Sequence, residues 1–256
     1  GATRFGAVET SEEGAKFASF LKAHSGLFEG VIICLPNFGD ENGAVAGVRD
    51  AGVPILNIAY PDELDKMDVS RRRDAFCGKF SVMDVLYQYG VPYTSLMPHA
   101  VMPDTDAFSR QIDVFDRICR VSNGMKRVTV GAIGALTTAF KTIRFDELTL
   151  QKYGITTEAL DLSEVFLRIK GKNKNSEAFK SKKKFLSLYT SWKNVPKEAL
   201  DKLTLLSLVL DEIIAEYKLD ALALRCWLEI EKELGVSPCV LLSELNNRGI
   251  PAACEL

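Results

Sequence analysis

The sequence has few of the residues from which most protein metal sites are built. His24 and His99 are the only two histidines among 256 residues, which excludes a histidine-rich metal site. The six cysteines are scattered without a CxxC spacing. The scattered positions indicate reduced thiols rather than a disulfide framework or a zinc site, and they predict a cytoplasmic protein.

An excess of charge is also missing. The 32 basic and 34 acidic residues leave a formal net charge of -2, which gives no overall field to attract nucleic acid or an anionic membrane. No apolar run approaches the roughly 20 residues of a membrane span, and the N-terminus lacks the apolar region of a signal peptide. We therefore expect neither a nucleic-acid partner nor a membrane partner. The basic stretch 168–184 is predicted to be a solvated, mobile loop.

Short apolar runs alternate with helical periodicity along the whole chain, an arrangement typical of parallel α/β units. The length of 256 residues favours two domains, and the 47% of apolar residues permits a core in each. Long helices are expected at about 104–122 and at 197–218. The predicted strands are 30–36, 53–60 and 91–98 in the first half, and 126–134, 155–163, 221–227 and 250–256 in the second.

Parallel sheets bind ligands at the carboxyl ends of their strands, so the loops there are the candidate sites. Asn37 and Phe38 directly follow the first predicted strand, and Trp227 ends a later one. For the first loop the alternative is a helix cap formed by Asp40 or Asn42. The segment 75–81, with Cys77 and Gly78, is a further candidate for the site. Its alternative interpretation is the start of a helix with a buried cysteine.

An acid near the end of the chain follows a short apolar run. Gly249 and Pro251 fix a turn, after which residues 252–254 predict a strand that would hold Glu255 rigidly. Rigid mounting suits a metal ligand or a catalytic base. The alternative is an ordinary solvated acid near a chain end.

Two long segments, Val130–Phe166 and Arg225–Glu255, resemble the L-fucose isomerase and L-arabinose isomerase family, in particular its fucose-isomerase-like members. The resemblance implies subunits with two N-terminal Rossmann-like α/β domains and a C-terminal catalytic domain. It predicts a first domain at 1–123 that lacks its first strand, a second at 124–250, and the start of a largely absent third domain at 251–256.

The resemblance also implies a chemistry and a site. Family members act on free sugars with a divalent metal, usually Mn²⁺, and Glu255 corresponds to the first of two acidic metal ligands. The second acid and a histidine are expected beyond this sequence. Residues implied to bind or approach the substrate are Asn37, Phe38, Cys77, Gly78 and Trp227, with the segment around Cys77 near the sugar site of an adjacent subunit of a homo-oligomer, a hexamer in the family.

The reaction implied is an aldose–ketose isomerisation, which moves a proton between adjacent carbons through an ene-diol. A divalent cation lowers the cost of the developing charge, and a neighbouring carboxylate takes and returns the proton. Glu255 is the predicted metal ligand and acid/base. One carboxylate cannot hold manganese tightly, so we expect these 256 residues to be inactive alone. The alternatives are a sugar-binding or sensor module and an oligomer-assembly domain without catalysis.

Overall fold

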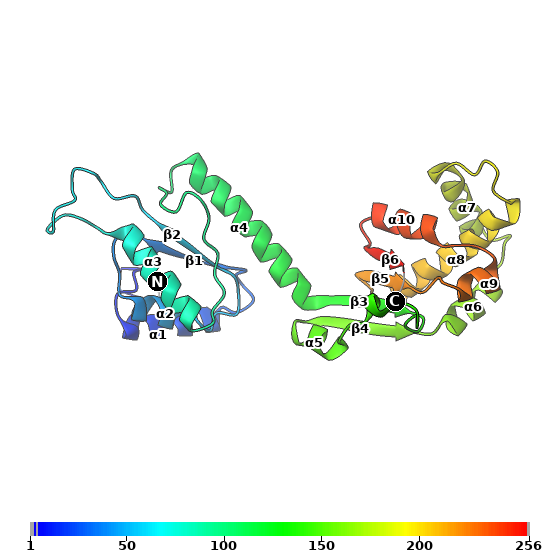
Figure 1. Ribbon diagram of the computed structural model, residues 1–256, viewed down its shortest axis with the longest axis horizontal. Helices are drawn as coiled ribbons and strands as arrows, with labels where there is room; N and C mark the ends of the chain where they lie inside the picture. Colours follow the sequence, from blue (N-terminus) through cyan, green and yellow to red (C-terminus); the bar gives the residue numbers. More distant parts are fainter. Residues whose placement is uncertain (1–2, 4, 255–256) are drawn as a thin grey trace. The chain divides into compact units, whose positions relative to one another are not determined.

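The computed structural model describes residue 3 and residues 5–254 of the chain. The chain divides into two compact units, Gly1–Gly124 and Met125–Leu256, and each is described by itself (Figure 1). Both units pair their strands in parallel, which confirms the predicted α/β class. Among the described residues, no helix is long and apolar enough to cross a membrane.

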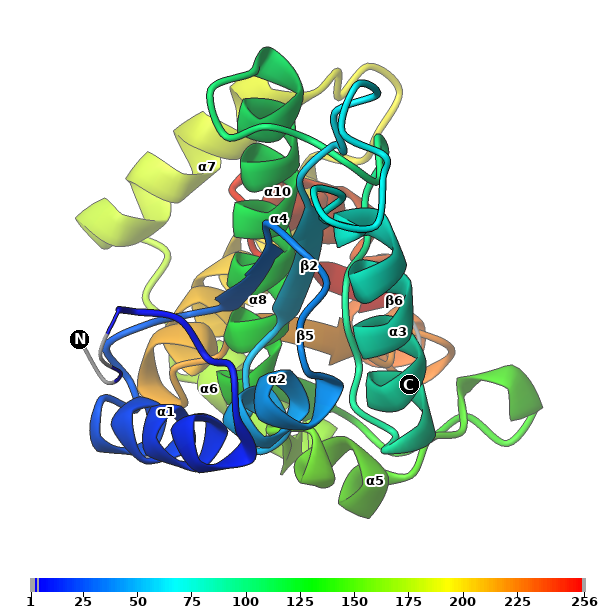
Figure 2. The ribbon, with the colours of Figure 1, turned by 90° about the vertical axis from the view of Figure 1, so that its left-hand side faces the viewer.

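The first unit has a two-stranded parallel sheet with helices on both of its faces (Figure 2). One face carries a core of Leu21, Val45, Val82 and neighbouring side chains, and the other face packs on Phe115 and Cys119. The elements are β1 (Val31–Leu35), β2 (Ile55–Ala59), α1 (Ser11–Ala23), α2 (Glu41–Val48), α3 (Ala75–Gln88) and α4 (Asp106–Gly124).

The strand predicted at 91–98 is not formed as a continuous strand. Only two isolated parallel bridges join this segment and its continuation to β2, one between Leu56 and Thr94 and one between Ala59 and Ala100. Pro92 and Pro98 have no backbone N–H to donate, so a continuous ladder cannot run through them. The segment nevertheless follows β2 in the same direction, and its end reaches the carboxyl edge of the sheet.

The second unit has a four-stranded parallel sheet in the order β4-β3-β5-β6. Its strands are β3 (Val128–Ile133), β4 (Ile155–Leu160), β5 (Ala221–Leu224) and β6 (Ala252–Cys254). Its helices are α5 (Glu147–Lys152), α6 (Leu162–Lys170), α7 (Glu177–Tyr189), α8 (Lys197–Glu216), α9 (Glu229–Leu234) and α10 (Cys239–Asn247), with short 3₁₀ helices η1 (Met125–Arg127) and η2 (Lys141–Ile143).

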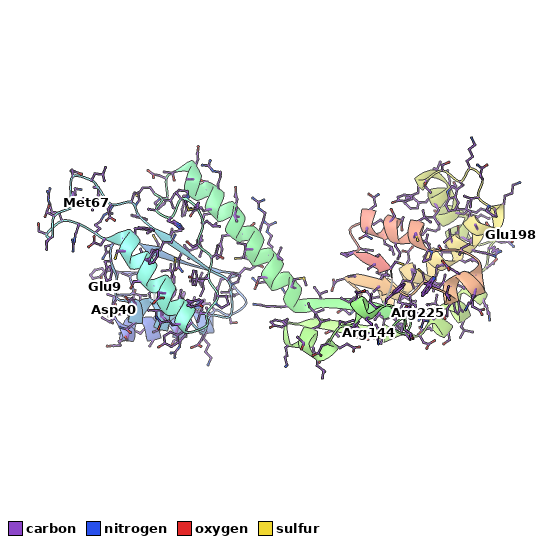
Figure 3. All side chains as sticks on the ribbon, in the orientation of Figure 1. Glu9, Asp40, Met67, Arg144, Glu198 and Arg225 are labelled. Carbon is purple, nitrogen blue, oxygen red and sulfur yellow. The ribbon has the colours of Figure 1, made fainter. Side chains whose placement is uncertain are left out.

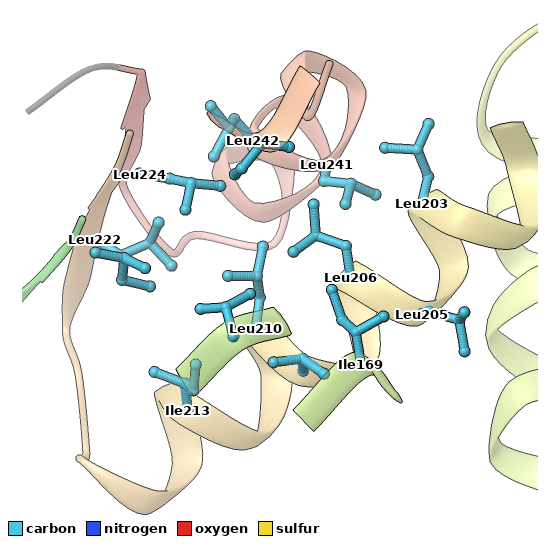
Figure 4. Close-up of a cluster of buried hydrophobic side chains, with 14 of the residues drawn as sticks. Ile169, Leu203, Leu205, Leu206, Leu210, Ile213, Leu222, Leu224, Leu241 and Leu242 are labelled. Atoms are coloured by element: carbon cyan, nitrogen blue, oxygen red, sulfur yellow. The ribbon is translucent and has the colours of Figure 1, made fainter. Parts of the chain in front are cut away.

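The core of the second unit forms around α8. Leu206, Leu210 and Ile213 of this helix are at most 1% exposed, and they pack with Leu222 and Leu224 of β5 and with leucines of α10 (Figure 4). Apolar residues at spacings of three and four place one continuous stripe on the sheet side of the helix. The helix predicted at 197–218 is therefore formed, and it carries the centre of this core.

The prediction of a mobile loop at 168–184 is wrong, because most of this stretch is helical. Ser176 caps α7 by accepting from the backbone N–H of Phe179, whose ring is buried. The basic side chains meet acids of α8: Lys182 pairs with Asp211, and Lys183 with Asp201. These ion pairs with the neighbouring helix allow the lysine-rich segment to pack as a helix.

Removing the Ile213 side chain should destabilise the second unit. Ile213→Ala deletes a fully buried side chain, and such changes cost about 2–5 kcal/mol. Leu188→Ala, at a side chain that is 79% exposed, should change stability by less than about 0.5 kcal/mol. Urea denaturation followed by tryptophan fluorescence measures both, since Trp192 and Trp227 lie in this unit. Equal midpoints for the two variants would contradict the assigned core.

Candidate functional site

The first predicted site loop lies at the carboxyl end of β1. Asp40 caps α2 by accepting from the backbone N–H of Asn42 at 2.7 Å, so the helix-cap alternative is realised for this residue. The preceding residues remain at the surface, with Phe38 47% exposed. The Phe38 backbone N–H donates to the Arg73 carbonyl oxygen at 2.6 Å. This bond ties the loop after β1 to the segment that leads into α3.

Gly78 brings the start of α3 against this loop. A Cβ atom at Gly78 would lie 3.0 Å from the Cα of Phe38, closer than packed side chains normally come, and 3.5 Å from the carbonyl oxygen of Asn37, an ordinary contact. The structure therefore places Asn37, Phe38 and Gly78 together. Cys77 is exposed, so the alternative of a buried cysteine at this helix start is wrong. The next turn of the helix supplies the burial instead, through residues such as Val82.

An aromatic cluster lies beside these residues. The Phe76 ring stacks on the His99 ring with centroids 5.9 Å apart, and its edge meets Phe80 at 6.1 Å. All three side chains are exposed, Phe80 to 67%. His99 comes from the segment that the bridges align with β2, which the sequence did not connect with α3. The only feature of the sequence that could have drawn attention to His99 is that it is one of two histidines.

Lys79 is a buried amine next to this surface. Its side chain is 1% exposed, and its Nζ donates to the His99 carbonyl oxygen at 2.9 Å. Burial lowers the pKa of Lys79 from 10.5 to about 8. Gln111 of α4 donates from Nε2 to the Pro98 carbonyl oxygen at 2.7 Å. The two side chains hold the backbone that carries the His99 ring.

In the second unit, Trp227 belongs to a cluster formed by the loops that follow β3 and β5. Its ring stacks on Phe140 with centroids 5.2 Å apart and planes 26° apart, and both side chains are partly exposed. Arg225, labelled in Figure 3, donates from Nη1 to the Ala135 carbonyl oxygen at 3.3 Å and pairs with Glu229 at 2.8 Å. The arginine therefore joins the two loops rather than projecting alone.

The segment that leads to Glu255 is anchored by a side chain of α10. Asn246 donates from Nδ2 to the Ala252 carbonyl oxygen at 2.8 Å, and its Oδ1 accepts from the Ala252 N–H at 3.2 Å. Gly249 has a φ of +81°, which supplies the turn expected before the strand. β6 then pairs with β5. Glu255 itself lies outside the described residues.

Within residue 3 and residues 5–254, no three side chains of histidine, cysteine, aspartate or glutamate gather in a group that could hold a metal ion. The described residues therefore do not supply the manganese ligands by themselves. The predicted Mn²⁺ site and the role of Glu255 stay predictions. What the described residues do form is two exposed aromatic clusters, one between α3 and His99 and one between the loops after β3 and β5.

The comparisons with known proteins agree on one class. The model of the fucose/sulfoquinovose isomerase N-terminal domain matches residues 1–126. The sulfoquinovose isomerase of Alkalicoccus urumqiensis is 24% identical over 243 residues, 93% of this chain and 52% of that protein. That of Priestia aryabhattai is 25% identical over 188 residues, 72% of this chain and 40% of that protein. The chain thus spans about half the length of these curated relatives or less.

The first unit therefore has the sequence character of a sugar-isomerase N-terminal domain. The chain is therefore similar to the fucose-isomerase-like family, the resemblance that its sequence motifs indicated.

A side chain at position 78 should push the loop after β1 away from α3. Gly78→Ala places a Cβ against the Phe38 backbone, and overpacking of this kind costs about 1–3 kcal/mol. Gly124→Ala is the matched control, since a Cβ there meets nothing within 4 Å and alanine favours a helix. Thermal unfolding followed by circular dichroism compares the variants. A Gly78→Ala protein as stable as Gly124→Ala would contradict the close approach.

The buried amine of Lys79 should make stability depend on pH. Between about 8 and 10.5 the unfolded chain binds more protons at this residue than the folded chain does, so its contribution to stability rises with pH across this window. Lys79→Met removes that rise. Urea denaturation at about pH 7 and about pH 10 measures it, with Lys22→Met, an exposed lysine, as the control that keeps the wild-type slope. An unchanged slope in Lys79→Met would show that the amine is not buried.

Proposed function

We propose that this chain is the N-terminal part of a metal-dependent aldose–ketose sugar isomerase that works through an ene-diol intermediate. The observation that carries the proposal is the match of residues 1–126 to the fucose/sulfoquinovose isomerase N-terminal domain. The relatives named sulfoquinovose isomerase, which align over as much as 93% of the chain, support the same reaction class.

The chemistry assigns the proton transfer to a carboxylate. Moving a proton between adjacent carbons needs a base held close to both of them. A rigidly held carboxylate can take the proton from one carbon and return it to the next. We assign this role, and that of metal ligand, to Glu255. A bound Mn²⁺ would supply Lewis-acid stabilisation of the ene-diol oxygens. Its remaining ligands are proposed to come from the rest of a longer protein, because the described residues form no group of three.

The aromatic clusters suit the binding of a sugar. The Phe140–Trp227 pair presents a flat apolar ring face next to polar loop backbone, the combination that small-molecule sites use. Asn37, Phe38, Cys77 and Gly78 are proposed to approach a sugar from a second direction, in the site of an adjacent subunit. The relatives' name makes sulfoquinovose the first sugar to test, with L-fucose and L-arabinose beside it.

We also infer a homo-oligomer in the cytoplasm, with a hexamer as the expected form. Exposed aromatic rings around the loop after β1, those of Phe38, Phe76 and Phe80, favour a covered surface. Sedimentation velocity of the full-length protein tests this proposal. A monomer would favour a sugar-binding module instead.

Residues 1–256 alone should bind manganese weakly and should not isomerise sugars, since one carboxylate is too few ligands. The longer parent protein, assayed with Mn²⁺ over the same sugars, should be active, and Glu255→Gln in it should lose at least about 100-fold in kcat. Titration calorimetry with Mn²⁺ gives a readout that does not depend on turnover. Metal-dependent isomerisation by residues 1–256, or full activity of the parent Glu255→Gln variant, would overturn the assignment.

A further inference from the structure

We propose that Cys226 and Cys254 form a redox-modification site, at which a small-molecule disulfide converts the two thiols into an intramolecular disulfide. Their Sγ atoms are 3.1 Å apart. The sulfurs of a disulfide lie about 2.05 Å apart, so the bond can form after a movement of about 1 Å.

The strands explain why the two thiols meet. β5 and β6 pair in parallel with Leu224 opposite Cys254, and Cys226 follows Leu224 by two residues where β5 has ended. The Cys226 side chain therefore meets Cys254 just beyond the paired part of the two strands.

The two cysteines differ in their access to solvent. Cys254 is exposed, whereas Cys226 is 6% exposed and belongs to the core of the second unit. A dissolved oxidant therefore reaches Cys254 first. The shielded Cys226 sulfur then reacts with the modified Cys254 beside it. One accessible thiol and one shielded thiol form the arrangement in which a mixed disulfide is resolved within the protein.

The exchange balances with glutathione disulfide as the oxidant. The Cys254 sulfur, after losing its proton, attacks one sulfur of glutathione disulfide; the bond between the glutathione sulfurs breaks and one glutathione leaves with a proton. The Cys226 sulfur loses its proton and displaces the second glutathione from Cys254. Two protein thiols are oxidised to one disulfide, and the small disulfide is reduced to two thiols.

The bond would close the loop 226–254, which contains α9 and α10, and it would fix the carboxyl end of β6 to the segment that follows β5. Glu255 is the next residue after Cys254. An effect of oxidation on sugar isomerisation rests on the proposed function. Formation of the disulfide does not, because it depends only on the two thiols.

Peptide mapping of the folded 256-residue chain tests the proposal. The protein is incubated with glutathione disulfide, alkylated with N-ethylmaleimide and cleaved with trypsin, which places Cys226 in peptide 226–232, Cys239 in 233–248 and Cys254 in 249–256. We expect a disulfide-linked pair of peptides 226–232 and 249–256, released by dithiothreitol. The intact oxidised chain should carry up to four maleimide or glutathione adducts, against six maleimides when reduced.

Three serine variants complete the test. Cys226→Ser should leave Cys254 as a stable mixed disulfide with glutathione, and Cys254→Ser should leave Cys226 reduced. Cys239→Ser, which removes another exposed thiol, should keep the wild-type linkage. Circular dichroism of the reduced variants checks their fold. Wild-type chain that carries glutathione on Cys254 without any link to Cys226, or a link of Cys254 to another cysteine, would overturn the proposal, whereas an inactive parent enzyme would not.

Discussion

Parallel pairing of strands is the constraint on which the arrangement of both units depends. Parallel neighbours cannot be joined by a tight hairpin, so the chain crosses back over a face of the sheet between them, mostly as helix. All strands of a sheet then end at the same edge. This is why the loops after β3 and β5 meet in the second unit, and why the loop after β1 meets α3 in the first, where α3 also contacts His99.

Close approach at these edges is achieved with small residues and backbone hydrogen bonds. Gly78 lets α3 touch the Phe38 backbone, and Gly134, with a φ of +101°, lies where a Cβ would come 2.7 Å from that of Arg225. Arg225 then bonds the carbonyl oxygen of Ala135. Contacts to the backbone therefore fix each edge, while the aromatic side chains stay exposed.

Much of the fold could be predicted because the strands of the core are short apolar runs. β1 and β2 fall inside the predicted ranges 30–36 and 53–60, and α8 follows its apolar period almost throughout. The segment 91–98 was mistaken for a strand because its apolar residues fit one, while its two prolines remove the N–H groups that a ladder needs. The lysine-rich α7 was missed because its acids lie on α8, more than ten residues away in sequence.

The candidate site could be predicted only in part, for a related reason. Positions after strands are readable from the sequence, which identified Asn37, Phe38 and Trp227. Their partners are not: Phe140 lies 87 residues before Trp227, and Lys79 reads as a solvated helix residue although its amine is buried against the His99 carbonyl. Tertiary contacts decide which side chains meet, and no local pattern encodes them.

The short strand β6 shows how a strand end can be held in place by few residues. Three strand residues provide only a limited ladder with β5, so the strand needs further support at both of its ends. Asn246 supplies it at Ala252 through two hydrogen bonds, and the thiol of Cys226 meets Cys254 at the other end. The first support is a fixed amide pair, whereas the second can change its covalent state. In the proposed exchange with glutathione disulfide, a covalent bond at Cys254 would add to the amide pair at Ala252.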